Sequence, residues 1–322
     1  MFPSATTPGK DTYKVRNWKA YNKSLVQRGR ITLWVEDSVL RAWRDTDTSK
    51  KVVGEQLYAD CIIQCCLLLG CVYHQPLRQT TGFVASLLAL LGRGDYAVPD
   101  YSTLCRRQGC LPVEVSRALA GSSKIDIALD STGLKVYGEG EWKVRKHGAG
   151  KRRTWRKLHI GIDVDTQEIV CVELTGNAED DAQVGAAMLQ GKTEQLSSFR
   201  GDGAYDDFKL REVLGSGIRQ IIPPPKDAVV RKGTRKKPVP DYLEQRNEAV
   251  EYIASQGRKE WKVKEGYHQR SLNEVAMFRY KTTFTGQMSA RKMENQKTEV
   301  QLKCKVLNLF RQQGMPVAYK AA

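Results

Sequence analysis

The sequence predicts an α/β protein with two regions: a mainly helical N-terminal region over residues 1–120, and a domain over residues 121–322 that combines a mixed five-stranded sheet with helices. The main observation is a change of hydrophobic pattern near Gly121, from the helical spacing before it to the alternation typical of strands after it. A length of 322 residues with 41% hydrophobic and 27% charged residues is enough for two globular units.

The N-terminal region contains several helical patterns. Tyr58–Leu69 is apolar almost all round, which predicts a buried helix, and Phe83–Leu91 predicts another. Pro99–Leu104 is typical of a turn that caps a short helix, which would carry Arg106 and Arg107. We interpret these elements as packed helices, with a helix-turn-helix as the alternative.

Five strands are predicted in the second region: Lys124–Asp130, Thr154–Asp163, Glu168–Leu174, Ser198–Asp202 and Arg219–Ile222. We expect the first three, joined by turns, to be antiparallel. Helices starting at Asp180 and near Asp206 connect the later strands, which we therefore expect to be parallel. Helices follow from about Tyr242 to the C-terminus. This element order is that of the ribonuclease H-like fold.

Two aspartates stand at predicted strand ends. Asp130 ends the first strand at a Ser-Thr-Gly turn, and Asp202 ends the fourth within Gly-Asp-Gly. In this fold the two strand ends are neighbours, and two close carboxylates repel unless a cation lies between them. Oxygen ligands without nearby His or Cys favour Mg²⁺ or Mn²⁺. The alternative is that each aspartate only forms a turn.

A helix predicted after Gly266 gathers four polar side chains. At about 100° per residue, Tyr267, Arg270, Glu274 and Lys281 lie within about 60° of one another. Apolar residues spread around its other faces, so we expect the helix to be packed on several sides and its charged face to line a polar cleft. The alternative is a surface ion pair between Arg270 and Glu274.

These motifs resemble those of a known family. The spacing Y-(2)-R-(3)-E-(6)-K matches the signature of bacterial insertion-sequence transposases of the IS4/IS5 superfamily. ALDSTGLKVYG, which contains Asp130, and RGDGAYD, which contains Asp202, resemble the two aspartate motifs of that family, and WRKLHIGIDVDTQEIV resembles its strand pair. YNKSLVQRGRITLWVED and PLRQTTGF are similar to the IS5 group, so the resemblance covers nearly the whole chain.

The resemblance implies a DDE mechanism of DNA transposition. In it, Asp130, Asp202 and Glu274 hold two divalent ions, Mg²⁺ with Mn²⁺ as the alternative, and DNA strands are cleaved and joined by in-line attack on phosphodiesters. Tyr267, Arg270 and Lys281 resemble the family residues that hold DNA phosphates near the cut. The resemblance also implies a cytoplasmic, nucleoid-associated bacterial protein.

The charge distribution supports a nucleic-acid partner. The formal net charge is +16, and basic residues are concentrated in residues 1–30, 143–157 and 226–237. We take Arg152, Arg153, Lys236 and Lys237 as candidate phosphate contacts. The expected partner is double-stranded DNA, as terminal inverted repeats and as target, and we expect the helical region 1–120 to be the DNA-binding region that reads the repeats. A second copy of the chain is expected in a homodimer or larger assembly on DNA. A generally basic solubility surface is the alternative.

Other classes of function fit less well. The chain has no run of 18 apolar residues, so we expect no membrane span, and its eight cysteines form no C-x-x-C pair, so we expect no zinc site. A ribonuclease H-like nuclease would lack the charged helix face at Tyr267–Lys281. A catalytically inactive, transposase-derived DNA-binding protein would typically lack one of the three acids.

Overall fold

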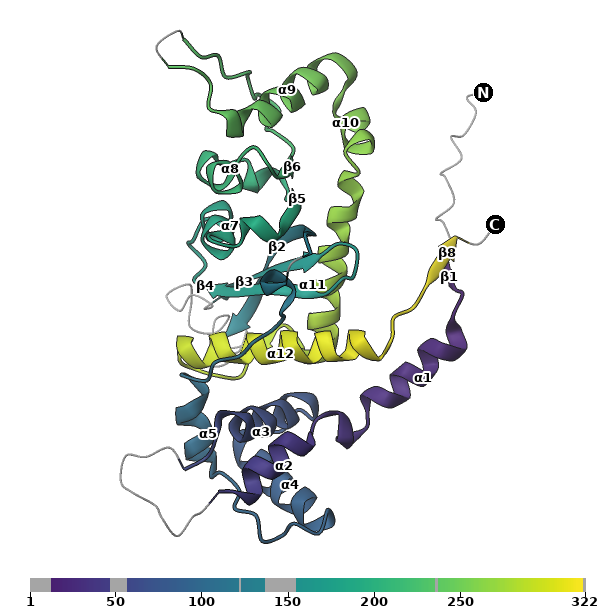
Figure 1. Cartoon of the computed structure of the whole chain (residues 1–322), viewed down its shortest axis with the longest axis vertical. Helices are drawn as coiled ribbons and strands as arrows, with labels where there is room; N and C mark the ends of the chain where they lie inside the picture. The colour runs from purple at the N-terminus through teal and green to yellow at the C-terminus, as the bar shows by residue number, and fades with distance from the viewer. Residues whose placement is uncertain (1–12, 47–56, 122, 137–154, 235–236, 321–322) are drawn as a thin grey trace, which may run out of the picture.

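The computed structural model describes residues 13–46, 57–121, 123–136, 155–234 and 237–320. In Figure 1 the N-terminal helices lie at one end of the molecule and the sheet lies in the middle, with the long helix α12 (Met293–Gln313) between them. The two ends of the described chain meet in a small antiparallel ribbon of β1 (Tyr13–Val15) and β8 (Ala318–Lys320). No helix in the described part of the chain is long and apolar enough to cross a membrane.

In the described part of the chain, the central sheet is mixed and has six strands. Five of them lie in the order β4-β3-β2-β5-β6: Ile169–Thr175, Trp155–Asp163, Ile125–Val136, Leu196–Arg200 and Arg219–Ile221. The pairs β2–β3 and β3–β4 are antiparallel, whereas β2–β5 and β5–β6 are parallel. This arrangement confirms the predicted fold. The sixth strand, β7 (Gln287–Met288), pairs in parallel with β2; its two residues are too few to carry a strand pattern.

The first predicted strand was too short. Strand β2 continues from Ile125 to Val136, through the Ser-Thr-Gly segment that was predicted to be a turn, so Asp130 lies within the strand. The reason is the length of its antiparallel partner, since β3 pairs with β2 as far as Lys135. On the other side, pairing with β5 stops at Ala128. Asp130 is therefore paired on one side only.

Helices cover both faces of the sheet. On one face, α7 (Asp181–Leu189) and α8 (Phe208–Leu214) pack over Ile127 and Leu129 of β2. On the other, Ala128 and Leu134 of β2 belong to the apolar cluster that contains residues of α12 and of α11 (Ser271–Phe284). The alternation of these β2 side chains between the two clusters follows from the geometry of a strand. Two further helices, α9 (Glu244–Gln256) and α10 (Arg258–Lys264), lie beyond β6.

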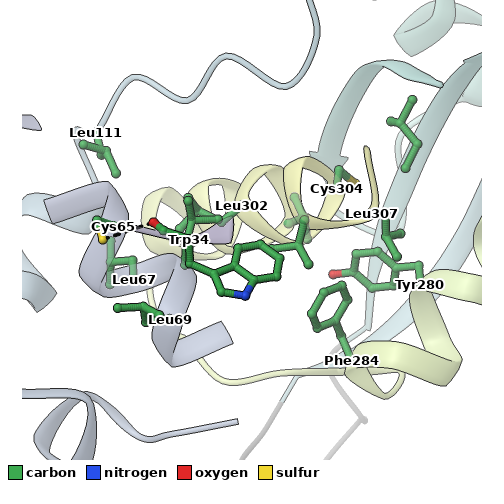
Figure 2. Close-up of a cluster of buried hydrophobic side chains, with 14 of the residues drawn as sticks. Trp34, Cys65, Leu67, Leu69, Leu111, Tyr280, Phe284, Leu302, Cys304 and Leu307 are labelled. Carbon is green, nitrogen blue, oxygen red and sulfur yellow. Dashed lines mark hydrogen bonds between the residues drawn. The ribbon is translucent and has the colours of Figure 1, made fainter. Parts of the chain in front are cut away.

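The N-terminal region contributes the helices α1 (Trp18–Arg28), α2 (Asp37–Arg44), α3 (Asp60–Val72), α4 (Leu77–Leu90) and α5 (Tyr101–Gln108). Helix α3 is buried along most of its length, which confirms the prediction for Tyr58–Leu69. Figure 2 shows Trp34 and Cys65 of this region in one cluster with Leu302 of α12 and Tyr280 of α11. The buried apolar core thus continues across the predicted boundary between residues 120 and 121.

Helix α5 begins as predicted, with Asp100 as its cap. The Asp100 carboxylate accepts a hydrogen bond from the backbone N–H of Ser102 at 2.8 Å. Arg107 donates to the carbonyl oxygen of Tyr58 at 2.8 Å and pairs with Asp60 at the start of α3. Arg107 therefore joins two helices, while Arg106 is exposed.

Candidate active site

The register of the sheet brings Asp130 and Asp202 to the same edge. Ala128 of β2 pairs with Arg200, the last residue of β5, and each aspartate follows two residues later on its own chain segment. Because the two strands are parallel, equal steps beyond a paired position keep residues adjacent. The Asp202 carboxylate also accepts a hydrogen bond from the N–H of Ala204 at 2.9 Å, so Asp202 caps the turn Gly203–Tyr205 as well.

Helix α11 is fixed across this part of the sheet by one buried amide. The side-chain nitrogen of Asn273 donates to the carbonyl oxygens of Ala128 in β2 (2.8 Å) and Ile160 in β3 (2.7 Å). The helix therefore crosses β2 two residues before Asp130. This position brings Glu274, the next residue of α11, to the same edge of the sheet.

Arg270 connects two of the three acids. Its Nη1 lies 2.8 Å from Oδ2 of Asp130, and its Nη2 pairs with Oε1 of Glu274. The Arg270 side chain is largely covered, whereas 56% of the Glu274 side chain is exposed. The alternative interpretation, an ion pair between Arg270 and Glu274, thus corresponds to an observed contact. Arg270 also pairs with Asp130, however, so it joins both carboxylates.

The segment that carries the four polar residues is not one regular α-helix. Tyr267–Arg270 forms a 3₁₀ turn after Gly266, which has a left-handed conformation (φ 65°), and the α-helix begins at Ser271. The expectation that α11 is packed on several sides was also wrong, because Phe278 is 69% exposed. The helix lies against the sheet on one side and leaves the side of Glu274 open.

Tyr267 and Lys281 flank the acids at either end of this segment. The Lys281 ammonium donates to Oγ1 of Thr132, two residues after Asp130, at 2.6 Å. The ring of Tyr267 lies 5.9 Å from the guanidinium of Arg270 and 6.1 Å from the ring of Trp261. The side chains of Tyr267, Arg270 and Lys281 therefore lie around Asp130, as predicted for one charged face.

Burial and like charge both act on Asp130. Burial is the largest cause that raises the pKa of its carboxyl above the ordinary value; the Ser131 N–H and Arg270 counteract this, and Asp202 and Glu274 raise it further. Asp202 and Glu274 are thus close enough for their charges to act on Asp130. Among the described residues, the guanidinium of Arg270 is the cation that pairs with Asp130 and Glu274.

The donor set fits a divalent cation of the Mg²⁺ type. Three carboxylates offer hard oxygen ligands and an excess of negative charge. Within the described ranges, no group of three or more His, Cys, Asp or Glu side chains is arranged to hold a metal ion as it stands. Arg270 lies between Asp130 and Glu274, so a cation held by both carboxylates requires this side chain to turn away.

The basic clusters are only partly described. Arg152, Arg153 and Lys236 lie outside the described residues. Lys237 is exposed and forms an isolated bridge with Thr234 in the loop before α9. Lys157, from the cluster 143–157, is bonded within the protein and is not a free cation: its ammonium pairs with Asp181 at 3.0 Å.

The structure adds residues that the sequence did not single out. Asp181, at the start of α7, accepts a hydrogen bond from Oγ of Ser131 at 2.9 Å, directly beside Asp130. Tyr205 is buried beside the same acids. An aspartate in a first helical turn is common, so Asp181 carried no signal of its own. Tyr205 lies within RGDGAYD, but that segment was matched for Asp202, and Tyr205 was not singled out.

Comparison with known protein families gives two matches. A family model described as a transposase DDE domain matches residues 121–309, and a second model with the same description matches residues 26–139. The first match covers more than half of the 322 residues and contains Asp130, Asp202 and Glu274. No solved structure matches the chain.

Proposed function

This chain belongs to the DDE transposase family, and from that premise we propose that it cleaves and joins DNA strands at the ends of a mobile element, with Asp130, Asp202 and Glu274 as metal ligands. The observation that carries the proposal is the convergence of three carboxylates, from β2, from the segment after β5 and from α11, on one partly open edge of the sheet. Carboxylates from separate elements are costly to bring together without a cation.

Asp130, Asp202 and Glu274 would hold two divalent ions, Mg²⁺ or Mn²⁺, which would supply activation of a water or a 3′-hydroxyl and stabilisation of the leaving oxygen. The chain's own side chains position the DNA. Arg270, once released from Asp130 and Glu274, is placed to pair with a scissile-strand phosphate, since a guanidinium binds phosphate and carboxylate with similar geometry. Lys281 and Tyr267 lie on either side of it and would hold neighbouring phosphates.

The partners follow from the same proposal. Terminal inverted repeats and target DNA are the substrates. The N-terminal helices, with exposed Arg106 on α5, would read the repeats. Two copies of the chain would join the two ends of the element. Sizing of the full chain on paired-end DNA tests the assembly, and full activity from a complex with one protein copy would refute it. Arg106→Ala should weaken the preference for repeat DNA over random DNA; an unchanged preference refutes this reading role.

Glu274→Gln tests the metal site. The substitution keeps the size of the side chain and removes its charge. If Glu274 were only a half-exposed surface partner of Arg270, the cost would be about 0.3 kcal/mol and cleavage would persist. As a metal ligand, its loss should lower Mg²⁺-dependent cleavage by orders of magnitude, on the order of 10³-fold.

The assay uses an inverted-repeat duplex already bound by the protein, so that binding and cutting are separated. Repeat binding and the unfolding temperature should remain near those of the wild type. Cutting at nearly the wild-type rate by the Glu274→Gln protein would remove this residue from the site and with it the assignment of three acids.

A further inference from the structure

A buried hydroxyl beside the acids has no partner. Tyr205 is 1% exposed, and its hydroxyl makes no hydrogen bond in the described part of the structure. A buried polar group without a partner is destabilising by about 1–3 kcal/mol and is uncommon in folded proteins. Burial of the Tyr205 hydroxyl without a partner is therefore unfavourable and has to be explained.

The ring of Tyr205 is held in one orientation by two glycines. A Cβ atom on Gly201 would lie 2.9 Å from the Cβ and Cγ of Tyr205, and one on Gly185 of α7 would lie 3.2 Å from its Cε1. The near end of the ring thus rests on the residue before Asp202, and its far end on α7. Gly185 stands one helical turn after Asp181, the first residue of α7.

Three carboxylates act electrostatically on the Tyr205 hydroxyl. Burial raises the pKa of Tyr205 most, and the charges of Asp181, Asp130 and Asp202 raise it further. The Asp181 carboxylate is already bonded to Ser131 at 2.9 Å and to Lys157 at 3.0 Å. The hydroxyl is thus a hydrogen-bond donor among acceptors, although none of them accepts from it in this state.

From this arrangement we infer that Tyr205 is a positioning residue of the acidic centre: its hydroxyl donates to a carboxylate of the centre, or to a water hydrating the ion, only when a divalent cation is bound. The inference rests on the proposed function. In the cation-free state Arg270 holds Asp130, and Asp202 caps its own turn. With a cation held by these carboxylates, one of them, or a water hydrating the ion, would become the acceptor for the Tyr205 hydroxyl.

The chain contains a matched control. Tyr280 of α11 is also fully buried with an unbonded hydroxyl, but its acidic neighbour is Glu299, which is paired with Lys303 at 2.6 Å. Tyr205→Phe and Tyr280→Phe therefore remove the same atom from similar surroundings. One of the two sites faces the acidic centre, and the other lies in the apolar core shown in Figure 2.

The experiment uses the full-length protein without DNA, in two measurements. In chelator, both variants should unfold at the wild-type temperature or above it, because each loses an unbonded buried hydroxyl. In a calorimetric titration with Mn²⁺ alone, the affinity of Tyr205→Phe should fall about tenfold or more, the usual effect of losing a hydrogen bond to a charged group. Tyr280→Phe should bind Mn²⁺ like the wild type.

Two results overturn the inference. One is a Mn²⁺ affinity that is unchanged in Tyr205→Phe or is lowered equally in both variants. The other is a lower unfolding temperature of Tyr205→Phe in chelator, which would show that the hydroxyl already has a partner without the ion. Glu274→Gln in the same titration separates the proposed metal site from the role of Tyr205. If Glu274→Gln binds Mn²⁺ with wild-type affinity, both proposals are overturned. If Glu274→Gln loses Mn²⁺ binding while Tyr205→Phe binds normally, only the role of Tyr205 is overturned.

Discussion

Two clusters of arginine and carboxylate take Asp202 and Asp206 from the same short segment and differ in charge balance. In one, Asp206 is shared by Arg211, at 2.8 Å, and Arg246, at 3.1 Å, and all three side chains are at least 92% buried. Both arginines also donate to neutral acceptors: Arg211 to Oε1 of Gln220 and Arg246 to the carbonyl oxygen of Val229. This cluster is complete and closed.

The other cluster has the opposite balance. One guanidinium, that of Arg270, serves both Asp130 and Glu274, and Asp202 adds a further negative charge nearby. Glu274 is open to solvent. The two clusters contain the same residue types, so residue type alone does not distinguish a structural ion cluster from a reactive one. They differ in the ratio of arginines to carboxylates and in the exposure of the side chains to solvent.

The largest effect on stability is expected in the closed cluster. Asp206→Asn leaves two buried guanidinium groups without a counter-charge, so the free energy of unfolding should fall by about 3–5 kcal/mol. The measurement is urea unfolding of the metal-free protein. Asp202→Asn, four residues earlier, is the matched control and should cost less than about 1 kcal/mol, because Asn also caps turns. Equal costs at the two positions would erase the distinction between the clusters.

A smaller effect of opposite sign is expected at Asp130. Its pKa is raised in the folded protein, so the ionised carboxylate destabilises the metal-free fold at neutral pH. Asp130→Asn should therefore raise the unfolding temperature in chelator near pH 7, by about 2 °C.

This gain has a defined pH dependence. It should shrink as the pH falls through the raised folded-state pKa toward the ordinary value of about 3.9, because the wild-type carboxyl is then protonated too. Thermal unfolding between about pH 7 and pH 4 checks it. A variant less stable than the wild type at neutral pH would mean that the Arg270 contact outweighs burial and like charge.

The smallest effect is expected at Asp126, on the same strand as Asp130. Its carboxylate accepts from Ser197 and, at 3.2 Å, from Nη1 of Arg200. Asp126→Asn keeps an acceptor for these donors, so DNA cleavage should stay near the wild-type rate and stability should fall by about 1 kcal/mol. The same cleavage assay as for Glu274→Gln measures it, and a loss comparable to that of Glu274→Gln would extend the reactive cluster to Asp126.

Local pattern was sufficient for much of the architecture. Alternating apolar residues predicted the five main strands, and the nearly all-apolar Tyr58–Leu69 predicted a buried helix. The failures occurred where pairing partners decide the outcome. Strand β2 extends past Asp130 because β3 continues beside it, and β7 exists because two residues of a connection happen to meet β2. Neither effect leaves a trace in local periodicity.

The sequence by itself determined the kind of protein and the candidate acids, because strand alternation, helix spacing and the Tyr267–Lys281 motif are local properties of the chain. Only the tertiary structure decided what each charged side chain does. Asp202 and Asp206 stand in one short segment, yet one faces the open edge of the sheet and the other is enclosed by two arginines. The unbonded hydroxyl of Tyr205 likewise exists only because α7 and the segment after β5 meet. Burial and charge balance are sums over neighbours distant in sequence, so they are set by the packing of the whole fold.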